Sequence, residues 1–313
     1  MRFAVFGAGG IGGYLGGRLA QAGEDVAIIA RGDHLTAIRD HGLRVDSIDG
    51  DFVFKPSIAT DNPVEVGPVD VVILGVKAWQ VAEAAVAMQP MVGQETCVLP
   101  LQNGVETRAQ LAAVLGDGAV LGGLGGIISS IVGPGHIRHA GAEPIVRFGE
   151  TDNHHSPRAD RLLEAFGRAG VRAEIPSNIE AAIWQKFMFI TASSGVGAVT
   201  RAPAGVWRSH PETWEMAIQI VREADAVARG NGIPLAGSEG GGAIAQLERI
   251  PPDGTLSMQR DIMEGRPSEL EVQNGAVVRF GQETGVPTPV NTFIYHCLLP
   301  LEMKARGQLE FPT

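Results

Sequence analysis

Gly7-Ala8-Gly9-Gly10-Ile11-Gly12 follows a short apolar run, Arg2–Phe6, and precedes a stretch of helical character at 13–22. A second apolar run at 25–30 completes a strand, a turn, a helix and a strand in that order. In a G-x-G-x-x-G turn the first glycine permits the tight turn and the second lets backbone amides approach a pyrophosphate, while the third lets the helix pack against the strand. The helix start adds unpaired N–H groups and the positive end of its dipole. The stretch therefore predicts that residues 7–12 bind a dinucleotide, with a purely structural turn as the alternative.

Arg31 follows the second predicted strand, where the kind of dinucleotide is distinguished. A chain that binds NAD usually carries Asp or Glu about 20 residues after the glycines, because a carboxylate bonds the ribose hydroxyls. A carboxylate repels a 2′-phosphate, whereas a guanidinium can bind it through two charge-assisted hydrogen bonds. Arg31 therefore predicts NADPH and NADP rather than NADH and NAD, with an ordinary solvated arginine as the alternative.

The composition of the 313-residue chain limits its partners and its location. Its net charge is −10, so we expect no nucleic-acid partner, since phosphate binding requires a basic surface. No apolar run reaches the length of about 18 residues that spans a bilayer, so we expect no membrane partner, and the first residues form a predicted strand rather than a signal peptide. Cys97 and Cys297 lie far apart and the histidines show no metal-ligand spacing, which favours a cytoplasmic protein with no metal site.

The first part of the chain alternates predicted strands with predicted helices. This alternation predicts an α/β domain with a doubly wound parallel sheet, in which ligands bind at the carboxyl ends of the strands. Predicted strands cover 2–6, 25–30, 69–76, 96–100 and 120–123, with helices at 34–41, 79–88 and 106–115. A predicted hairpin at 127–132 and 136–139 is followed by a strand at 145–148, a helix at 157–169 and a strand at 171–174.

Beyond residue 175 the pattern becomes mainly helical, with predicted helices at 178–192, 211–231 and 269–284. We therefore predict two domains, a Rossmann-type NADP-binding domain over 1–176 and an all-helical substrate and catalytic domain over 177–313. Helical second domains often pair, which leaves a homodimer open.

Two polar residues follow predicted strands at the edge where the cofactor is expected. Lys77 ends the third strand and could meet a cofactor phosphate or ribose, or could pack its stem and extend its ammonium into water. Asn103 could hold a polar substrate group near the nicotinamide, or could form the turn that Asn-Gly favours. Position alone leaves both alternatives open for each residue.

Three residues of the second domain could carry chemistry. Lys186 lies in an otherwise apolar helical stretch, where partial burial lowers the pKa of an ammonium and suits it to give a proton to a carbonyl oxygen. The alternative is a lysine that packs on a helix and reaches water. Glu269 heads the predicted helix at 269–284, either as an acid partner or as a carboxylate favoured by the helix dipole. Ser257 follows a Pro-Pro break, and its alternative is a helix N-cap.

These motifs together resemble the ketopantoate reductase (2-dehydropantoate 2-reductase) family over almost the whole chain. Each phrase is weak alone, but their ordered set is specific. After the glycine motif the matching phrases are Ala30-Arg31-Gly32, Val76-Lys77-Ala78-Trp79-Gln80, Gln102-Asn103-Gly104, Trp184-Gln185-Lys186, Ser257-Met258, Gly265-Arg266, Ser268-Glu269-Leu270-Glu271 and Asn274-Gly275.

The resemblance implies a Rossmann domain joined to a helical domain like that of 6-phosphogluconate dehydrogenase, and NADPH-dependent reduction of a 2-oxo acid. It implies that Arg31 binds the 2′-phosphate and that Lys77 lines the cofactor site. It further implies that Asn103 orients the substrate and the nicotinamide. Lys186 would be the general acid, with Ser257 at the substrate and Glu269 completing the acid–base network.

The sequence departs from the family pattern on the helix that carries Lys186. The family usually places asparagines one and two helical turns after this lysine, where the chain has Ile190 and Ser194. Spacings of four and eight residues keep all three side chains on one helical face, so we expect Ile190 and Ser194 to line the substrate site. Missing polar contacts shift substrate selectivity by orders of magnitude, which favours a bulkier or more apolar 2-oxo acid.

The sequence thus predicts an NADPH-dependent reductase of a small-molecule 2-oxo acid, with 2-dehydropantoate as the first candidate substrate. One alternative keeps the fold and reduces another carbonyl or an imine, as opine-type dehydrogenases do. A second alternative is a nucleotide-binding sensor without turnover, although the presence of Lys186 and Glu269 argues against it.

Overall fold

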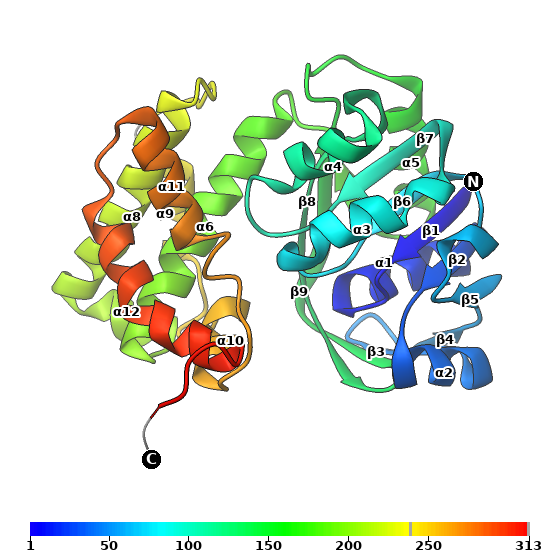
Figure 1. Cartoon of the computed structure of the whole chain (residues 1–313), viewed down its shortest axis with the longest axis horizontal. Coiled ribbons are helices and arrows are strands. Elements are labelled where there is room, and N and C mark those ends of the chain that lie inside the picture. The colour runs from blue at the N-terminus through cyan, green and yellow to red at the C-terminus, as the bar shows by residue number, and fades with distance from the viewer. Residues whose placement is uncertain (238–239, 312–313) are drawn as a thin grey trace. The chain divides into compact units, whose positions relative to one another are not determined.

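The computed structural model describes residues 1–237 and 240–311 (Figure 1). Contacts divide the chain into two compact units, Met1–Gln102 with Glu106–Ile179 and Asn103–Val105 with Glu180–Thr313. The short segment Asn103–Val105 thus belongs with the C-terminal unit, although it follows a strand of the first. That residues 1–176 bind the nucleotide and residues 177–313 carry catalysis stays a prediction.

The first unit contains the predicted parallel sheet. Its strands are β1 (Arg2–Phe6), β2 (Asp25–Ile29), β5 (Ile58–Thr60), β6 (Val69–Leu74) and β7 (Val92–Pro100). They pair in the order β5-β2-β1-β6-β7, and every pairing is parallel. From β1 the chain first adds β2 and β5 on one side of the sheet. It later adds β6 and β7 on the other side of β1. The direction in which strands are added therefore reverses beside β1. The predicted doubly wound sheet is confirmed, and the glycine turn follows β1 at this switch point.

Both faces of this sheet are buried, as β1 shows. Phe3 and Val5 belong to one apolar cluster and Ala4 and Phe6 to another, because successive side chains of a strand point to opposite faces. Helices α3 (Val81–Ala87) and α4 (Thr107–Leu115) cover the Ala4 face (Figure 1). Continuous burial explains why the strands show unbroken apolar runs in the sequence.

The first unit contains a second sheet, of which the sequence predicted three strands but not β3 (Leu43–Ser47), β4 (Phe52–Phe54) or their assembly into one sheet. Its other strands are β8 (Gly122–Gly133), β9 (His136–Gly149) and β10 (Arg172–Glu174). The strands predicted at 127–132, 136–139 and 145–148 are parts of the long hairpin β8–β9. Helices α1 (Gly10–Gln21) and α5 (Pro157–Arg168) share one apolar cluster with both sheets. β3 and β4 were missed because short, half-exposed strands give no continuous apolar run.

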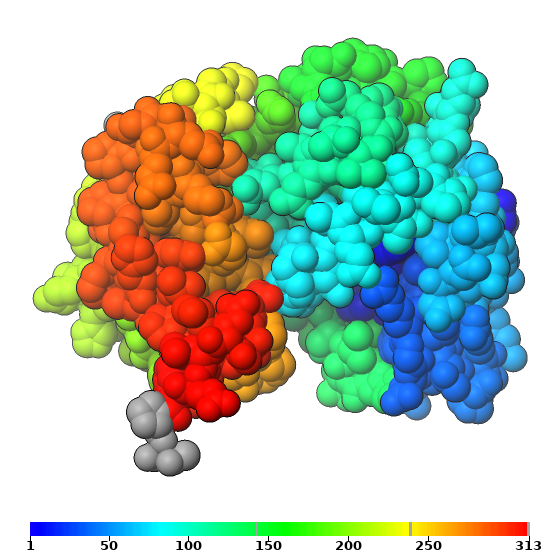
Figure 2. Space-filling view, in the orientation of Figure 1, coloured from blue at the N-terminus to red at the C-terminus, as the bar shows by residue number. Residues whose placement is uncertain are grey.

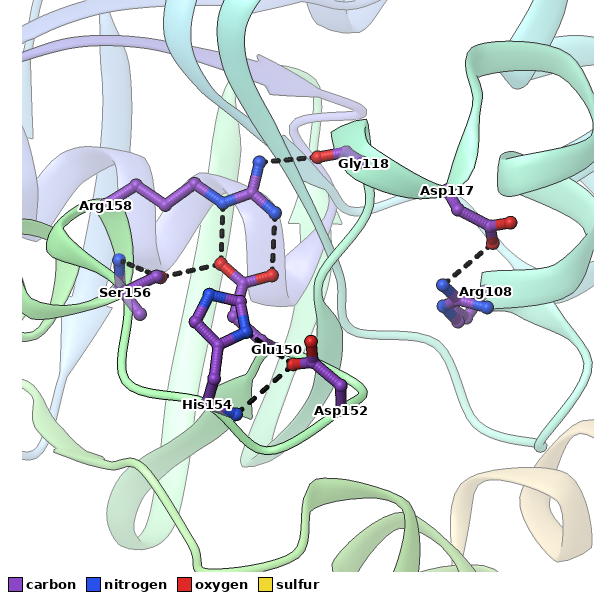
Figure 3. A network of polar contacts seen from close by, with 9 residues as sticks. Arg108, Asp117, Gly118, Glu150, Asp152, His154, Ser156 and Arg158 are labelled. Carbon is purple, nitrogen blue, oxygen red and sulfur yellow. Dashed lines mark hydrogen bonds and ion pairs between the residues drawn. The ribbon is translucent and has the colours of Figure 1, made fainter.

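A buried ion pair ties α5 to the end of β9. Both carboxylate oxygens of Glu150 accept hydrogen bonds from Arg158, each at 2.7 Å, and Ser156 donates to the same carboxylate at 2.6 Å (Figure 3). Arg158 also donates to the carbonyl oxygen of Gly118 at 2.5 Å. Burial raises the pKa of the Glu150 carboxyl, but the bonds from Arg158 and Ser156 outweigh it and lower the pKa below its usual value.

The second unit is helical, as predicted: among its described residues helices are the only regular secondary structure, and loops and turns join them. Its helices are α6 (Ile179–Thr200, starting at the last residue of the first unit), α7 (Ala204–Ser209), α8 (Pro211–Gly230), α9 (Gly241–Glu248), α10 (Ser257–Met263), α11 (Asn274–Thr284) and α12 (Pro289–Ala305). Helix α6 extends beyond the predicted residue 192. α11 and α12 lie side by side at the surface of this unit (Figure 2, orange and red). Among the described residues, no helix combines the length and the apolar character that crossing a membrane requires.

The smaller elements complete the first unit. They are the helix α2 (Gly32–His41) and the 3-10 turns η1 (Pro63–Glu65), η2 (Ala78–Gln80), η3 (Gln89–Met91) and η4 (Asp117–Ala119). The strand predicted at 120–123 is confirmed in part, because Gly122 and Gly123 begin β8 and Val120 forms a parallel bridge with Val98 of β7.

Candidate active site

Three glycines of the motif are required by the fold itself. Gly7 has a φ of 98°, a left-handed conformation that side chains rarely adopt. A Cβ at Gly12 would lie 2.3 Å from the carbonyl oxygen of Gly7, and one at Gly10 would lie 2.4 Å from that of Ser129. Neither position has room for a methyl group, so Gly10 and Gly12 let α1 approach β1 and β8.

Gly9 differs from the other three glycines, because neither its backbone angles nor its neighbours require glycine at this position. Its φ of −70° is ordinary for any residue. A Cβ there would meet its nearest neighbour, the carbonyl oxygen of Gly75, at 3.7 Å, which is ordinary van der Waals contact. Gly9 is the N-cap of α1 and makes no side-chain cap bond. A glycine that neither its backbone angles nor its packing require, at the start of a helix, fits a ligand that needs close contact with backbone amides.

His34 holds the glycine turn from the side, a role that the sequence analysis missed. Its Nδ1 accepts a hydrogen bond from the Gly135 N–H at 3.0 Å, so its Nε2 carries the proton and donates to the carbonyl oxygen of Ala8 at 2.8 Å. The imidazole thereby links the glycine turn to the β8–β9 turn. The position of His34 two residues into a helix gave no signal for this contact.

Arg31 and Lys77 are both exposed side chains of the first unit. The Arg31 guanidinium pairs with Glu83 of α3 at 2.8 Å, and both side chains are about two-thirds exposed, at 63% and 65%. The Lys77 ammonium lies 5.6 Å from the centre of the Trp79 ring. The roles of Arg31 and Lys77 in cofactor binding stay predictions.

The second unit brings together three of the predicted site residues. Asn103 donates a hydrogen bond from its Nδ2 to Oε2 of Glu269 at 2.8 Å, although 166 positions separate them in the chain. Glu269 is only 5% exposed. Burial lowers the pKa of the Lys186 ammonium from 10.5 to about 8, and the negative charge of Glu269 opposes this shift. The predicted lowering of this pKa is confirmed.

This grouping suits proton transfer to an oxygen atom. An ammonium with a pKa near 8 is charged at neutral pH yet gives up its proton readily. The nearby carboxylate stabilises the charged form, and the amide of Asn103 fixes the carboxylate oxygen that accepts its bond. Lys186, Glu269 and Asn103 together therefore form a candidate acid–base site, and their catalytic roles stay predictions.

The local structure around Glu269 and Ser257 differs from the predictions. Glu269 does not head a helix, because α11 begins at Asn274 and residues 269–273 form a bend and turns. The helix dipole is therefore not the reason for this carboxylate. Ser257 is the first residue of α10, whose N-cap is Leu256, so the N-cap alternative is wrong.

Ile190 and Ser194 lie on α6 one and two turns after Lys186, as their spacing requires. Their exposed fractions are 6% and 1%, so both side chains are part of the packed helical unit. Their contact with substrate stays a prediction, as does that of Ser257.

Comparison with known proteins gives family matches for both parts of the chain. The family described as Ketopantoate reductase PanE/ApbA matches residues 3–153, and its C-terminal counterpart matches residues 178–302. A curated relative from Mesorhizobium japonicum, named 2-dehydropantoate 2-reductase, is 31% identical over 92% of this chain and 94% of its own length.

Two solved structures resemble the chain over nearly its full length. A PanE/ApbA family ketopantoate reductase from Ralstonia eutropha JMP134 has a TM-score of 0.87 at 32% identity, covering 98% of this chain and 100% of its own. A D-mandelate dehydrogenase, solved as a ternary structure with NADH and anilino(oxo)acetate, has a TM-score of 0.89 at 25% identity. The alignment covers 98% of this chain and 99% of the dehydrogenase.

Proposed function

The chain belongs to the ketopantoate reductase family, and from this membership we propose that it is an oxidoreductase that reduces a 2-oxo acid to a 2-hydroxy acid. The observation that carries the proposal is the grouping of Lys186, Glu269 and Asn103. A ketone that accepts a hydride develops negative charge on its oxygen, and a positioned acid of suitable pKa lowers the barrier to that step.

Each residue of the grouping has a distinct role in this proposal. A bound nicotinamide supplies the hydride that reaches the ketone carbon. Lys186 protonates the oxygen, or stabilises it as an ammonium. Glu269 keeps Lys186 charged by its field, and Asn103 holds the Glu269 carboxylate while orienting the substrate. Ser257 contacts the substrate, and the substrate's carboxylate is the group that we propose it binds.

The glycine turn fits the pyrophosphate of the nucleotide. Gly9 is the N-cap of α1 and has no packing reason to be glycine, while Gly7, Gly10 and Gly12 shape the turn, with Ala8 and Ile11 completing the motif. This arrangement supports nicotinamide dinucleotide binding at residues 7–12.

We further propose NADPH as the preferred reductant. Arg31 can bind a 2′-phosphate by charge-assisted bonds, and Lys77 adds a second cation. In the structure the Arg31 guanidinium forms an ion pair with the Glu83 carboxylate, so a 2′-phosphate must displace this carboxylate to bind Arg31. The pair is exposed, and such pairs contribute at most about 1 kcal/mol, which a doubly charged phosphate outweighs.

The first candidate substrate is 2-dehydropantoate, which the names of several relatives support. A second candidate, a bulkier or more apolar 2-oxo acid, is favoured by Ile190 in place of a polar amide. The D-mandelate dehydrogenase neighbour, solved with an oxo acid that bears an aromatic ring, is consistent with that candidate.

The decisive assay measures NADPH and NADH oxidation with 2-dehydropantoate beside a panel of 2-oxo acids, each with and without an amine. Oxidation with 2-dehydropantoate at the highest kcat/KM supports the first candidate, and preference for an aromatic or branched acid supports the second. A requirement for the amine indicates an opine-type reaction. Nucleotide binding without oxidation of any substrate contradicts the proposal and favours a sensor.

The setting of the protein is part of the same proposal. Its net charge of −10 supports the absence of a nucleic-acid partner. Cys97 and Cys297 are both free thiols, which fits a reducing, cytoplasmic location. A homodimer stays open.

A further inference from the structure

Glu302 of α12 binds the residue that precedes Glu269. Its two carboxylate oxygens accept hydrogen bonds from the Ser268 backbone N–H at 3.1 and 3.0 Å. One of them also accepts from the Ser268 hydroxyl at 2.5 Å. The exposed fractions of Glu302 and Ser268 are 5% and 1%, so these bonds are shielded from water. A buried carboxylate thus holds both the main chain and the side chain of Ser268.

Arg306, the C-cap residue of α12, closes this contact. Its Nε donates to Glu302 at 2.6 Å, and its Nη2 donates to the carbonyl oxygen of Ser268 at 3.0 Å. The Ser268 hydroxyl oxygen in turn accepts from the Leu270 N–H at 3.2 Å. The backbone is therefore fixed immediately before and immediately after Glu269. We call Glu302, Arg306 and Ser268 the Ser268 clamp.

The clamp supplies rigidity that regular structure does not. Residues 266–273 form no helix or strand, so helical hydrogen bonds do not set the direction of the Glu269 side chain. The carboxylate must nevertheless meet Asn103 at 2.8 Å and act on the Lys186 ammonium. A displacement of about 1 Å at a reacting group costs up to about a hundredfold in rate.

Folding alone does not account for a buried carboxylate at position 302. Burying a charged pair is expensive, and well-packed apolar side chains of similar volume are often as stabilising. The carboxylate here accepts two hydrogens of one residue, the Ser268 N–H, which both oxygens share, and the Ser268 hydroxyl, and it pairs with the guanidinium of the residue that caps its own helix. That arrangement favours a role in fixing geometry.

We propose that Glu302, completed by Arg306, is a positioning residue that sets the Glu269 carboxylate against Asn103 and Lys186. The inference rests on the proposed function, because it assigns Glu302 an effect on the same acid–base site. The charged groups around Glu269 in this scheme are Lys186 on α6 and, through Ser268, the ion pair between Glu302 of α12 and Arg306, the C-cap of that helix.

The test replaces Glu302 by Gln, which has nearly the same shape but presents an NH2 group where one oxygen accepted a hydrogen. We expect kcat to fall about tenfold or more, with little change in the KM for the nucleotide. The alkaline limb of the rate profile should also move to lower pH, because a displaced Glu269 no longer supports the charge of Lys186. Loss of stability alone does not move that limb.

Glu223→Gln is the matched control. Glu223 is also a buried carboxylate of the helical unit, at 9% exposure, and it accepts hydrogen bonds from the N–H groups of Val290 and Asn291 at 2.8 and 2.9 Å. The control should lose stability without changing the pH profile. Thermal unfolding of both variants verifies that the comparison is between folded proteins.

A double variant tests whether Glu302 acts through Glu269. In a Glu269→Gln background, Glu302→Gln should lower kcat less than about twofold further, because the effects of residues that act as a unit are not additive. Should Glu302→Gln fail to fold, Ser268→Ala removes the hydroxyl bonds alone, and we expect it to shift the alkaline limb in the same direction.

The outcomes separate the two proposals. Absence of 2-oxo acid reduction by the unmodified protein overturns the proposed function. An active protein in which Glu302→Gln or Ser268→Ala behaves like Glu223→Gln, or in which the two Glu→Gln effects multiply, overturns the positioning role and leaves the function standing.

Discussion

Raising the pH above about 8 is expected to remove the proton from Lys186 and to slow the reduction. Burial lowers the pKa of this ammonium from 10.5 to about 8, while Glu269 opposes the shift. A donor of that pKa is about nine-tenths protonated at pH 7 and about one-tenth protonated at pH 9. The value of kcat/KM should therefore fall about tenfold per pH unit above pH 8, whereas an ordinary lysine would keep nearly all of its protons at pH 9.

Initial rates of NADPH oxidation between pH 6 and pH 10, at constant ionic strength, measure this limb. Lys186→Met should lower kcat about a hundredfold or more and abolish the limb, because no proton donor remains. Glu269→Gln should move the limb to lower pH, because it removes the field that favours the charged ammonium. A wild-type limb near pH 10, or an unchanged limb in Lys186→Met, would refute Lys186 as the donor.

The same pKa difference predicts an effect on stability that does not depend on activity. The folded pKa of Lys186 lies below the unfolded value, so the unfolded chain binds more protons between pH 8 and pH 10.5. The free energy of unfolding should therefore rise across this window, by up to about 3 kcal/mol. Lys186→Met should reduce that rise, as urea unfolding at several pH values can measure.

Three further substitutions test other parts of the structure. Gly9→Ala should lose less than about 1 kcal/mol of stability yet bind NADPH about tenfold more weakly, whereas Gly12→Ala should lose about 2 kcal/mol of stability by overpacking. Urea unfolding measures the stability of both variants, and nucleotide titration measures their binding of NADPH. Equal stability losses in the two variants would contradict this interpretation of the turn. Glu83→Gln should tighten NADPH binding by up to about fivefold and leave NADH binding unchanged, because it frees the arginine from a surface ion pair; a parallel gain for NADH would argue against 2′-phosphate recognition there. Arg158→Met should lower the free energy of unfolding at pH 7 by about 3 kcal/mol, because it strands the Glu150 carboxylate. The lowered pKa of that carboxyl means that the loss should shrink as the pH falls through its folded pKa, and a loss independent of pH would count against the ion pair.

Local patterns in the sequence determined the parallel sheet, the glycine turn and the long helices. Neighbouring residues determine β1, the turn at Gly7 and the start of α1. A buried strand needs an apolar run, and a positive φ or a close helix approach needs glycine, so each requirement is visible in adjacent positions of the sequence. The position of Lys186 in an apolar helix was equally readable, since burial of its neighbours follows from their composition.

Only the tertiary structure decided which distant residues meet. The bond from Asn103 to Glu269 spans 166 positions, and the clamp on Ser268 comes from a helix 34 positions away. The sheet that contains β3 and β4, the pairing of Arg31 with Glu83 and the non-helical backbone at Glu269 were likewise unreadable from local patterns. The physical reason is that such contacts depend on the packing of whole elements, whereas a sequence records directly only the periodicity and conformational preferences of adjacent residues.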